Sequence, residues 1–175
     1  MLTIVRRIAL FLGVAAILAL IAARPAAAAP LPASGSAAVP VRAAGEFTAN
    51  VDFASLATRE VGQACEFTVR GALTFTGTLS GVATGTTTAL IFAPCATAST
   101  NPPGTFADVF RFASTVRGTV DGVPVVGDLA YAGVTREGGG IEATITLRAD
   151  RARAVLRAAA TVAVGGTYAG VAQAG

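Results

Sequence analysis

The sequence predicts an all-β protein, a small antiparallel up-and-down barrel of seven or eight strands that follows a cleaved N-terminal signal peptide. From Cys65 to Leu79 every odd position is apolar or glycine, and most even positions are threonine or charged. This period of two is typical of a strand with one buried and one wet face. Turn signals at residues 121–122 and 138–140 separate further segments with the same alternation. A barrel is expected because closure leaves no unpaired strand edges.

Residues 1–29 have the features of a secretory signal peptide. Arg6 and Arg7 precede an apolar run over residues 8–23, and small residues then lead to Ala29 and Pro30. The alternative is an uncleaved anchor, but sixteen residues fall short of the roughly 20 that cross a bilayer. We therefore expect an exported protein, secreted or held in the cell envelope outside the cytoplasm, with no stable membrane span after cleavage.

The exported remainder is expected to be one β-barrel domain over residues 45–175, preceded by a flexible linker. Residues 30–44 are rich in Ala, Pro and Ser, which is typical of a linker. All 13 basic residues are arginine, and three of them leave with the signal peptide. The remaining ten arginines balance the charge of ten acidic residues. Since the domain is neutral and lacks a basic patch, no nucleic-acid partner is expected.

The first strands are expected near residues 46–53 and from Cys65 to Leu79. Ser80-Gly81 is predicted to form a two-residue turn between Leu79 and the next strand. With that turn, the even positions from Thr84 to Phe92 share the inner face with Leu79 and the odd positions before it.

Cys65 and Cys95 predict a disulfide, because an even number of cysteines in an exported chain is read first as a bridge. The alternatives are a metal pair or a reactive thiol, and neither has a histidine to assist it. The predicted turn places Cys65 opposite residue 96, so that a single bulge would bring the two thiols together.

The second hairpin has a stronger signal. Asp121-Gly122 is typical of a type I′ turn, and alternating apolar residues flank it on both sides. Pairing about this turn places Val120 opposite Val123 and Phe112 opposite Tyr131, so that the two apolar faces coincide.

The C-terminal third predicts three more strands. Glycines 138–140 form a turn into a strand whose inner residues run from Ile141 to Leu147. After a turn at residues 150–153, alternate residues from Leu156 to Val164 are expected to point inward, although the alanine content of this segment also suits a helix. A short last strand is expected after Gly166.

Four turn-rich segments carry a resemblance to a known family: residues 75–88, 104–111, 118–122 and 165–170. They are similar to bacterial proteins described as allene oxide cyclase barrel-like, and more distantly to plant allene oxide cyclases and dirigent proteins, whose last strands carry a comparable Gly-Gly-Thr turn. The resemblance spans roughly residues 65–171. It implies an eight-stranded barrel with a mainly apolar cavity, in which characterised members steer a reactive intermediate by shape.

The missing residue types exclude several chemistries. The chain has no histidine, which excludes a Ser-His-Asp or Cys-His arrangement and the usual zinc ligand sets. It has no lysine, which excludes a Schiff base. No phosphate-binding loop is present either, so no metal and no cofactor is expected. Carboxylate, tyrosine and water remain for proton transfer.

Asp108 is the candidate acid or base. It shares the spacing of Phe106, Phe110 and Phe112, which points its carboxylate into the barrel or its mouth, where burial would raise its pKa. The preferred interpretation is that the strand begins after Asp108 and leaves the carboxylate in water. Tyr131 and Tyr168 are both expected to be core residues with satisfied hydroxyls.

The favoured function is a non-enzymatic module that binds a small apolar ligand inside the barrel. One alternative is a non-covalent isomerase or cyclase of the allene oxide cyclase type. Another is a structural or interaction domain whose barrel is filled by its own side chains. The inward-facing residues expected to surround a ligand are Phe67, Leu73, Phe75, Phe110, Phe112 and Tyr131.

Overall fold

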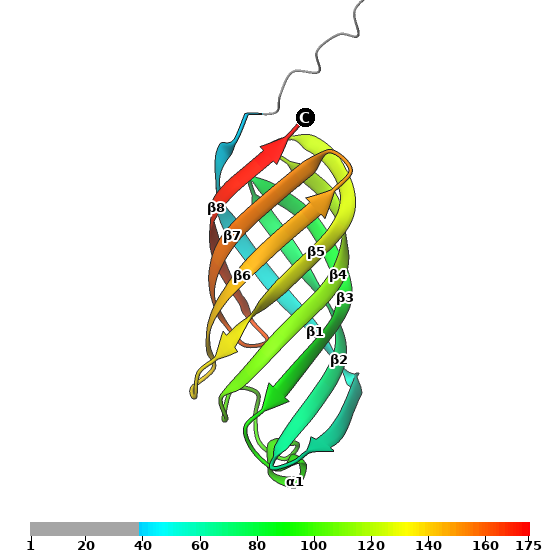
Figure 1. The fold of residues 1–175 in the computed structure, drawn as a ribbon, viewed down its shortest axis with the longest axis vertical. Coiled ribbons are helices and arrows are strands. Elements are labelled where there is room, and N and C mark those ends of the chain that lie inside the picture. The colour runs from blue at the N-terminus through cyan, green and yellow to red at the C-terminus, as the bar shows by residue number, and fades with distance from the viewer. Residues whose placement is uncertain (1–38) are drawn as a thin grey trace, which may run out of the picture. The chain divides into compact units, whose positions relative to one another are not determined.

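Eight antiparallel strands form a closed barrel in the computed structural model, which describes residues 39–175 (Figure 1). Each strand pairs with the next along the chain, and β8 pairs with β1 to close the sheet. This confirms the predicted all-β antiparallel barrel. The strands are β1 (Val41–Val61), β2 (Ala64–Gly77), β3 (Leu79–Ile91), β4 (Asp108–Val120), β5 (Val123–Thr135), β6 (Gly140–Ala149), β7 (Ala152–Thr161) and β8 (Gly165–Ala174), with one helical turn, α1 (Cys95–Ala98), between β3 and β4.

The two ends of the barrel differ. One end, here called the packed end, carries the turns after β2, β4 and β6 and the end of β8. The other, the mouth end, carries the turns after β1, β5 and β7 and the long connection over residues 92–107. Figure 1 shows α1 at the mouth end, opposite the C-terminus.

The second hairpin has the predicted register. Val120 pairs with Val123 and Phe112 with Tyr131. Asp121 and Gly122 both have positive φ, of 49° and 79°, as a type I′ turn requires. Pro124 pairs with Thr119 beyond the last β5–β6 pair, so its missing N–H removes no bond from the β6 ladder.

The first hairpin turns earlier than predicted. Phe75 pairs with Gly81, so the turn is centred on Thr78 and not on Ser80-Gly81. Gly77 supplies the left-handed conformation, with a φ of 101°, and the Thr78 hydroxyl bonds to the backbone of Ala44 at 3.2 Å. Because the register moves by an odd number of residues, the odd positions of β3 face inward and the prediction for its even positions was wrong.

The Cys65–Cys95 disulfide is present, but a bulge does not form it. Cys65 lies opposite Ile91, and Cys95 reaches it from α1 after β3 has ended. Glu60 accepts a hydrogen bond from the backbone N–H of Cys95 at 3.1 Å. The bridge therefore fastens the connection between β3 and β4 to the mouth end of β2.

The chain termini of the domain also differ from expectation. β1 begins at Val41, inside the segment predicted as a linker, and Ala43 is already buried. The predicted signal peptide and most of the linker lie outside the described residues. Residues 152–161 form strand β7, so the helix considered for this segment was wrong. Val164 follows the end of β7 and is exposed, not inward. No helix in the described part of the chain is long and apolar enough to cross a membrane.

The packed half of the barrel is filled by its own side chains. Its large inner side chains are 3% exposed or less, and they include Leu79, Val116, Val120, Val125, Leu129, Leu147, Leu156 and Tyr168. The Tyr168 hydroxyl accepts a bond from Leu79 N–H at 2.9 Å. Its one proton has two carbonyl acceptors within reach, Thr76 O at 2.9 Å and Leu79 O at 3.0 Å. These contacts tie β8 to the turn after β2, and they confirm the satisfied hydroxyl predicted for Tyr168.

Candidate functional site

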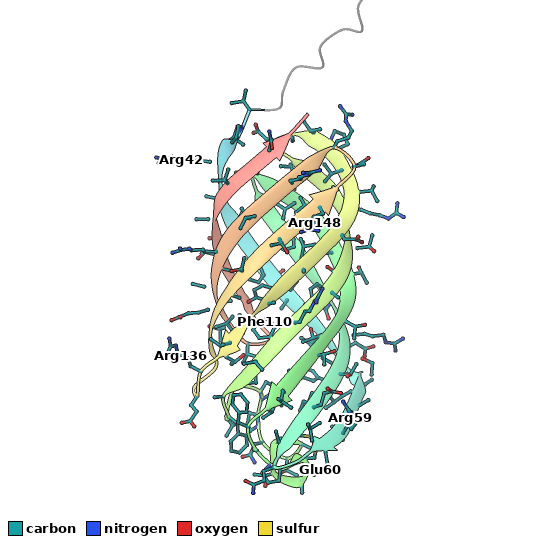
Figure 2. The ribbon with its side chains drawn as sticks, in the orientation of Figure 1. Arg42, Arg59, Glu60, Phe110, Arg136 and Arg148 are labelled. Atoms are coloured by element: carbon teal, nitrogen blue, oxygen red, sulfur yellow. A yellow bond between two sulfur atoms is a disulfide. The ribbon has the colours of Figure 1, made fainter. Side chains whose placement is uncertain are left out.

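A cavity of about 270 Å³ lies in the mouth half of the barrel. Its wall is formed by the inner faces of the strands, and residues 98–106 of the β3–β4 connection border it. Figure 2 places Phe110 in the half of the barrel nearer α1. The barrel is therefore hollow toward its mouth and filled toward its packed end.

A series of aromatic contacts runs from the cavity wall into the packed half. The Tyr131 ring lies 5.4 Å from Phe47, Phe47 lies 5.5 Å from Phe75, and Phe75 lies 6.0 Å from Tyr168, measured between ring centroids. Phe110 contacts Tyr131 edge to face at 5.0 Å. Edge-to-face and tilted pairs of this kind are favourable, so these rings stabilise one another where the cavity meets the packed half.

Five of the six residues predicted to surround a ligand do line this cavity: Phe67, Leu73, Phe110, Phe112 and Tyr131. Phe75 does not, and its prediction was wrong. It is 1% exposed and packs between Phe47 and Tyr168 in the filled half. Alternation gives the face on which a side chain lies but not its height along the barrel.

Two parts of the wall were missed from the sequence. Phe47 faces the cavity from β1, and the alternation of Ala43, Phe47 and Ala49 could have identified it. The connection over residues 98–106 has no periodic pattern, so only the structure reveals that it borders the cavity. Its Phe106 packs with Phe67 against the disulfide.

Asp108 is buried, contrary to the preferred interpretation that it stands in water. β4 begins at this residue, and Asp108 pairs with Ile91 on one side and Thr135 on the other. It lines the cavity and is only 8% exposed. Burial raises the pKa of its carboxyl group, and a hydrogen bond from Thr135 opposes this in part. One carboxylate oxygen, Oδ1, is buried without a hydrogen-bond partner.

Tyr131 carries a second unpartnered polar atom. Its ring is buried as predicted, but its hydroxyl has no hydrogen-bond partner, so that part of the prediction was wrong. Burial raises the pKa of this phenol. A buried polar group without a partner is unusual in a native protein and requires an explanation. Two such atoms on one cavity wall mark it as the candidate functional site.

Charge is scarce on the cavity wall. The charged residues that line it are Asp108 and Arg70. The Arg70 side chain is 73% exposed and pairs with Asp52 at 3.4 Å, so it lies at the rim. Glu142 lies outside the cavity and pairs with Arg136. Among the described residues no group of three His, Cys, Asp or Glu side chains is arranged to hold a metal ion.

Comparisons of the chain with protein-family models, with curated proteins and with solved structures gave no match.

The position of Asp108 predicts a pH dependence of stability. Because its pKa is raised, the folded carboxyl keeps its proton at pH values where the unfolded one, with a pKa of about 3.9, is ionised. The contribution of Asp108 to the free energy of unfolding is therefore fully present below about pH 4 and is lost as the pH rises through the folded pKa. Denaturant unfolding of the wild type and of Asp108→Asn between about pH 3 and pH 8 should show the wild type losing stability relative to the variant. A constant difference over this range would mean that the carboxyl lies in solvent.

Proposed function

We propose that the protein binds a small apolar ligand in the mouth half of its barrel. The observation that carries this proposal is the cavity of about 270 Å³, whose wall is mostly aliphatic and aromatic. Ligand pockets are commonly apolar with a few polar groups that fix orientation, and Asp108 and Tyr131 supply such groups here. A barrel serving purely as a structural domain would gain stability from filling this space, as it does at the packed end.

The β3–β4 connection forms one side of the mouth and is anchored there. Cys65, Ala93, Cys95 and Ala98 form a small buried cluster of their own, and Phe67 and Phe106 pack between this cluster and the cavity. The disulfide thus holds one side of the entrance in place. A ligand would enter past this connection and rest on Phe47 and Tyr131.

Filling the cavity tests this proposal. Ala160 on β7 lines it, whereas its neighbour Ala159 is exposed on the outer face. Ala160→Phe places a ring where the ligand is proposed to lie, and it should weaken binding of 1-naphthylmethanol, a neutral apolar probe, at least about tenfold. Ala159→Phe adds the same ring outside the barrel and should bind the probe like the wild type.

Calorimetry or the probe's own fluorescence measures both affinities. Equal binding by the two variants, or no saturable binding by the wild type, would contradict the proposal.

A second function is supported by Asp108. A buried carboxyl with a raised pKa on a cavity wall can act as a general acid or base, as a non-covalent isomerase requires. The carboxylate would take a proton from a carbon next to a carbonyl group and return it to another carbon of the same substrate. The resemblance to allene oxide cyclase barrel-like proteins is consistent with isomerase or cyclase chemistry.

Isomerisation of 3-cyclohexenone to the conjugated 2-cyclohexenone, followed by ultraviolet absorbance, tests this second function. The reaction moves one proton from the carbon beside the carbonyl to the far carbon of the alkene. We expect Asp108→Asn to lower the rate at least about 100-fold. An unchanged rate in this variant would exclude Asp108 as the base and leave ligand binding as the function.

We propose that the protein acts outside the cytoplasm. The N-terminal pattern of the sequence supports export, and so does a disulfide, because such bonds persist in oxidising compartments. The proposed binding module would then meet its ligand in the cell envelope or in the surrounding medium.

A further inference from the structure

We propose that the ligand is a lipophilic amine, bound as a cation between the Asp108 carboxylate and the aromatic side chains of the cavity. This inference rests on the proposed binding function and specifies the chemical class of its ligand. A neutral apolar ligand would leave the buried carboxyl group in this interior without a charged partner. Besides the two tyrosines, the buried polar or charged side chains of the described residues are Asp108 and Thr135, which are paired across β4 and β5.

Asp108 has a place for a cationic partner. Its Oδ1 atom is buried without a hydrogen-bond partner, and no cation lies in the described interior to neutralise the carboxylate. Among the described residues, Arg70 is the one arginine on the cavity wall, and it is exposed at the rim and paired with Asp52. Figure 2 shows Arg42, Arg59 and Arg136 pointing away from the barrel. An ammonium group would supply the missing donor and the missing charge at once.

Aromatic side chains line the cavity together with Asp108. Phe106 and Phe110 lie two residues before and after Asp108 and also line the cavity. Phe67 lines the cavity too, and it packs against the same buried cluster around the disulfide as Ile91, the residue opposite Asp108. The faces of aromatic rings attract cations, and this attraction strengthens when water is excluded. A carboxylate among phenylalanines thus favours an organic cation.

The same features disfavour anions. A ligand carboxylate or phosphate would meet the Asp108 carboxyl in an interior of low dielectric, with no buried arginine among the described residues to pair with it. A neutral ligand could occupy the apolar surface but would leave the carboxyl without its charge partner. Burial raises the pKa of the free Asp108 carboxyl, so binding of the cation should release a proton at a pH where this carboxyl is protonated.

Three probes with one ring system test the inference on the protein: 1-naphthylmethylamine as its cation, neutral 1-naphthylmethanol, and anionic 1-naphthoate. We expect the wild type to bind the cation at least about tenfold more tightly than the alcohol, and the anion at least about tenfold more weakly than the alcohol. Asp108→Asn should lose the preference for the cation over the alcohol. Asp128→Asn removes an exposed carboxylate from the outer face of β5 and should keep the preference.

Two outcomes would overturn the inference and leave the binding function intact: equal affinity of the wild type for the cation and the alcohol, or a preference that persists in Asp108→Asn. Failure of the wild type to bind even the alcohol would reject the binding function itself. If Asp108→Asn does not fold, the wild type provides the same test, because its preference for the cation should disappear as acid protonates Asp108. A preference that is constant down to about pH 3 would contradict the role of this carboxylate.

Discussion

Removing the disulfide with the double substitution Cys65→Ala and Cys95→Ala is expected to lower the free energy of unfolding by about 3–4 kcal/mol. The two cysteines are 30 residues apart in sequence, and the bridge restricts the unfolded chain over that length. Denaturant unfolding of the oxidised wild type and of the double variant measures the difference.

The same variant should also loosen the mouth. The disulfide anchors the β3–β4 connection, whose residues border the cavity, while the packed half of the barrel lies away from it. Hydrogen exchange should therefore rise over residues 92–107 and stay low in β5 and β6. Loss of less than about 1 kcal/mol, or exchange that rises equally throughout the barrel, would contradict the anchoring role.

Two phenylalanines on β2 are expected to differ in how much they contribute to the free energy of unfolding. Phe75→Ala should lower the free energy of unfolding by about 3–5 kcal/mol, because Phe75 is 1% exposed and its ring contacts Phe47 and Tyr168. Phe67→Ala removes the same ring from a half-buried position on the cavity wall and should cost about half as much or less. Both residues lie on the inner face of β2, so the comparison keeps the strand and the substitution constant.

Thermal and denaturant unfolding of the two variants provide the measurement. Equal losses would mean that the barrel is filled alike at the heights of Phe67 and Phe75. A larger loss for Phe67→Ala would contradict the division into a filled half and a hollow half.

The barrel could be predicted because its strands carry local signals. Asp121-Gly122 requires positive φ at both positions, so one dipeptide determined the register of β4 and β5 along their whole length. The first hairpin lacked such a dipeptide. Gly77 and Gly81 both suit a turn, and choosing the second moved every side chain of β3 to the wrong face.

The site was predictable only in part, for a physical reason. Sequence alternation identified Phe110, Phe112 and Tyr131 as inward residues, and they line the cavity. Alternation does not say how far along the barrel axis a side chain lies, so Phe75 was assigned to the cavity although it packs in the filled half. Whether Asp108 is buried depended on where β4 begins, and pairing with Thr135 decides this through contacts distant in sequence.

The central claim, that half of the barrel is hollow and accepts an apolar guest, is tested most directly by a crystal structure of the protein under xenon pressure. Xenon enters dry apolar cavities regardless of the natural ligand. The structure predicts xenon in the mouth half, among Leu73, Phe110 and Tyr131. An interior without xenon, with side chains closed over that space, would contradict the claim.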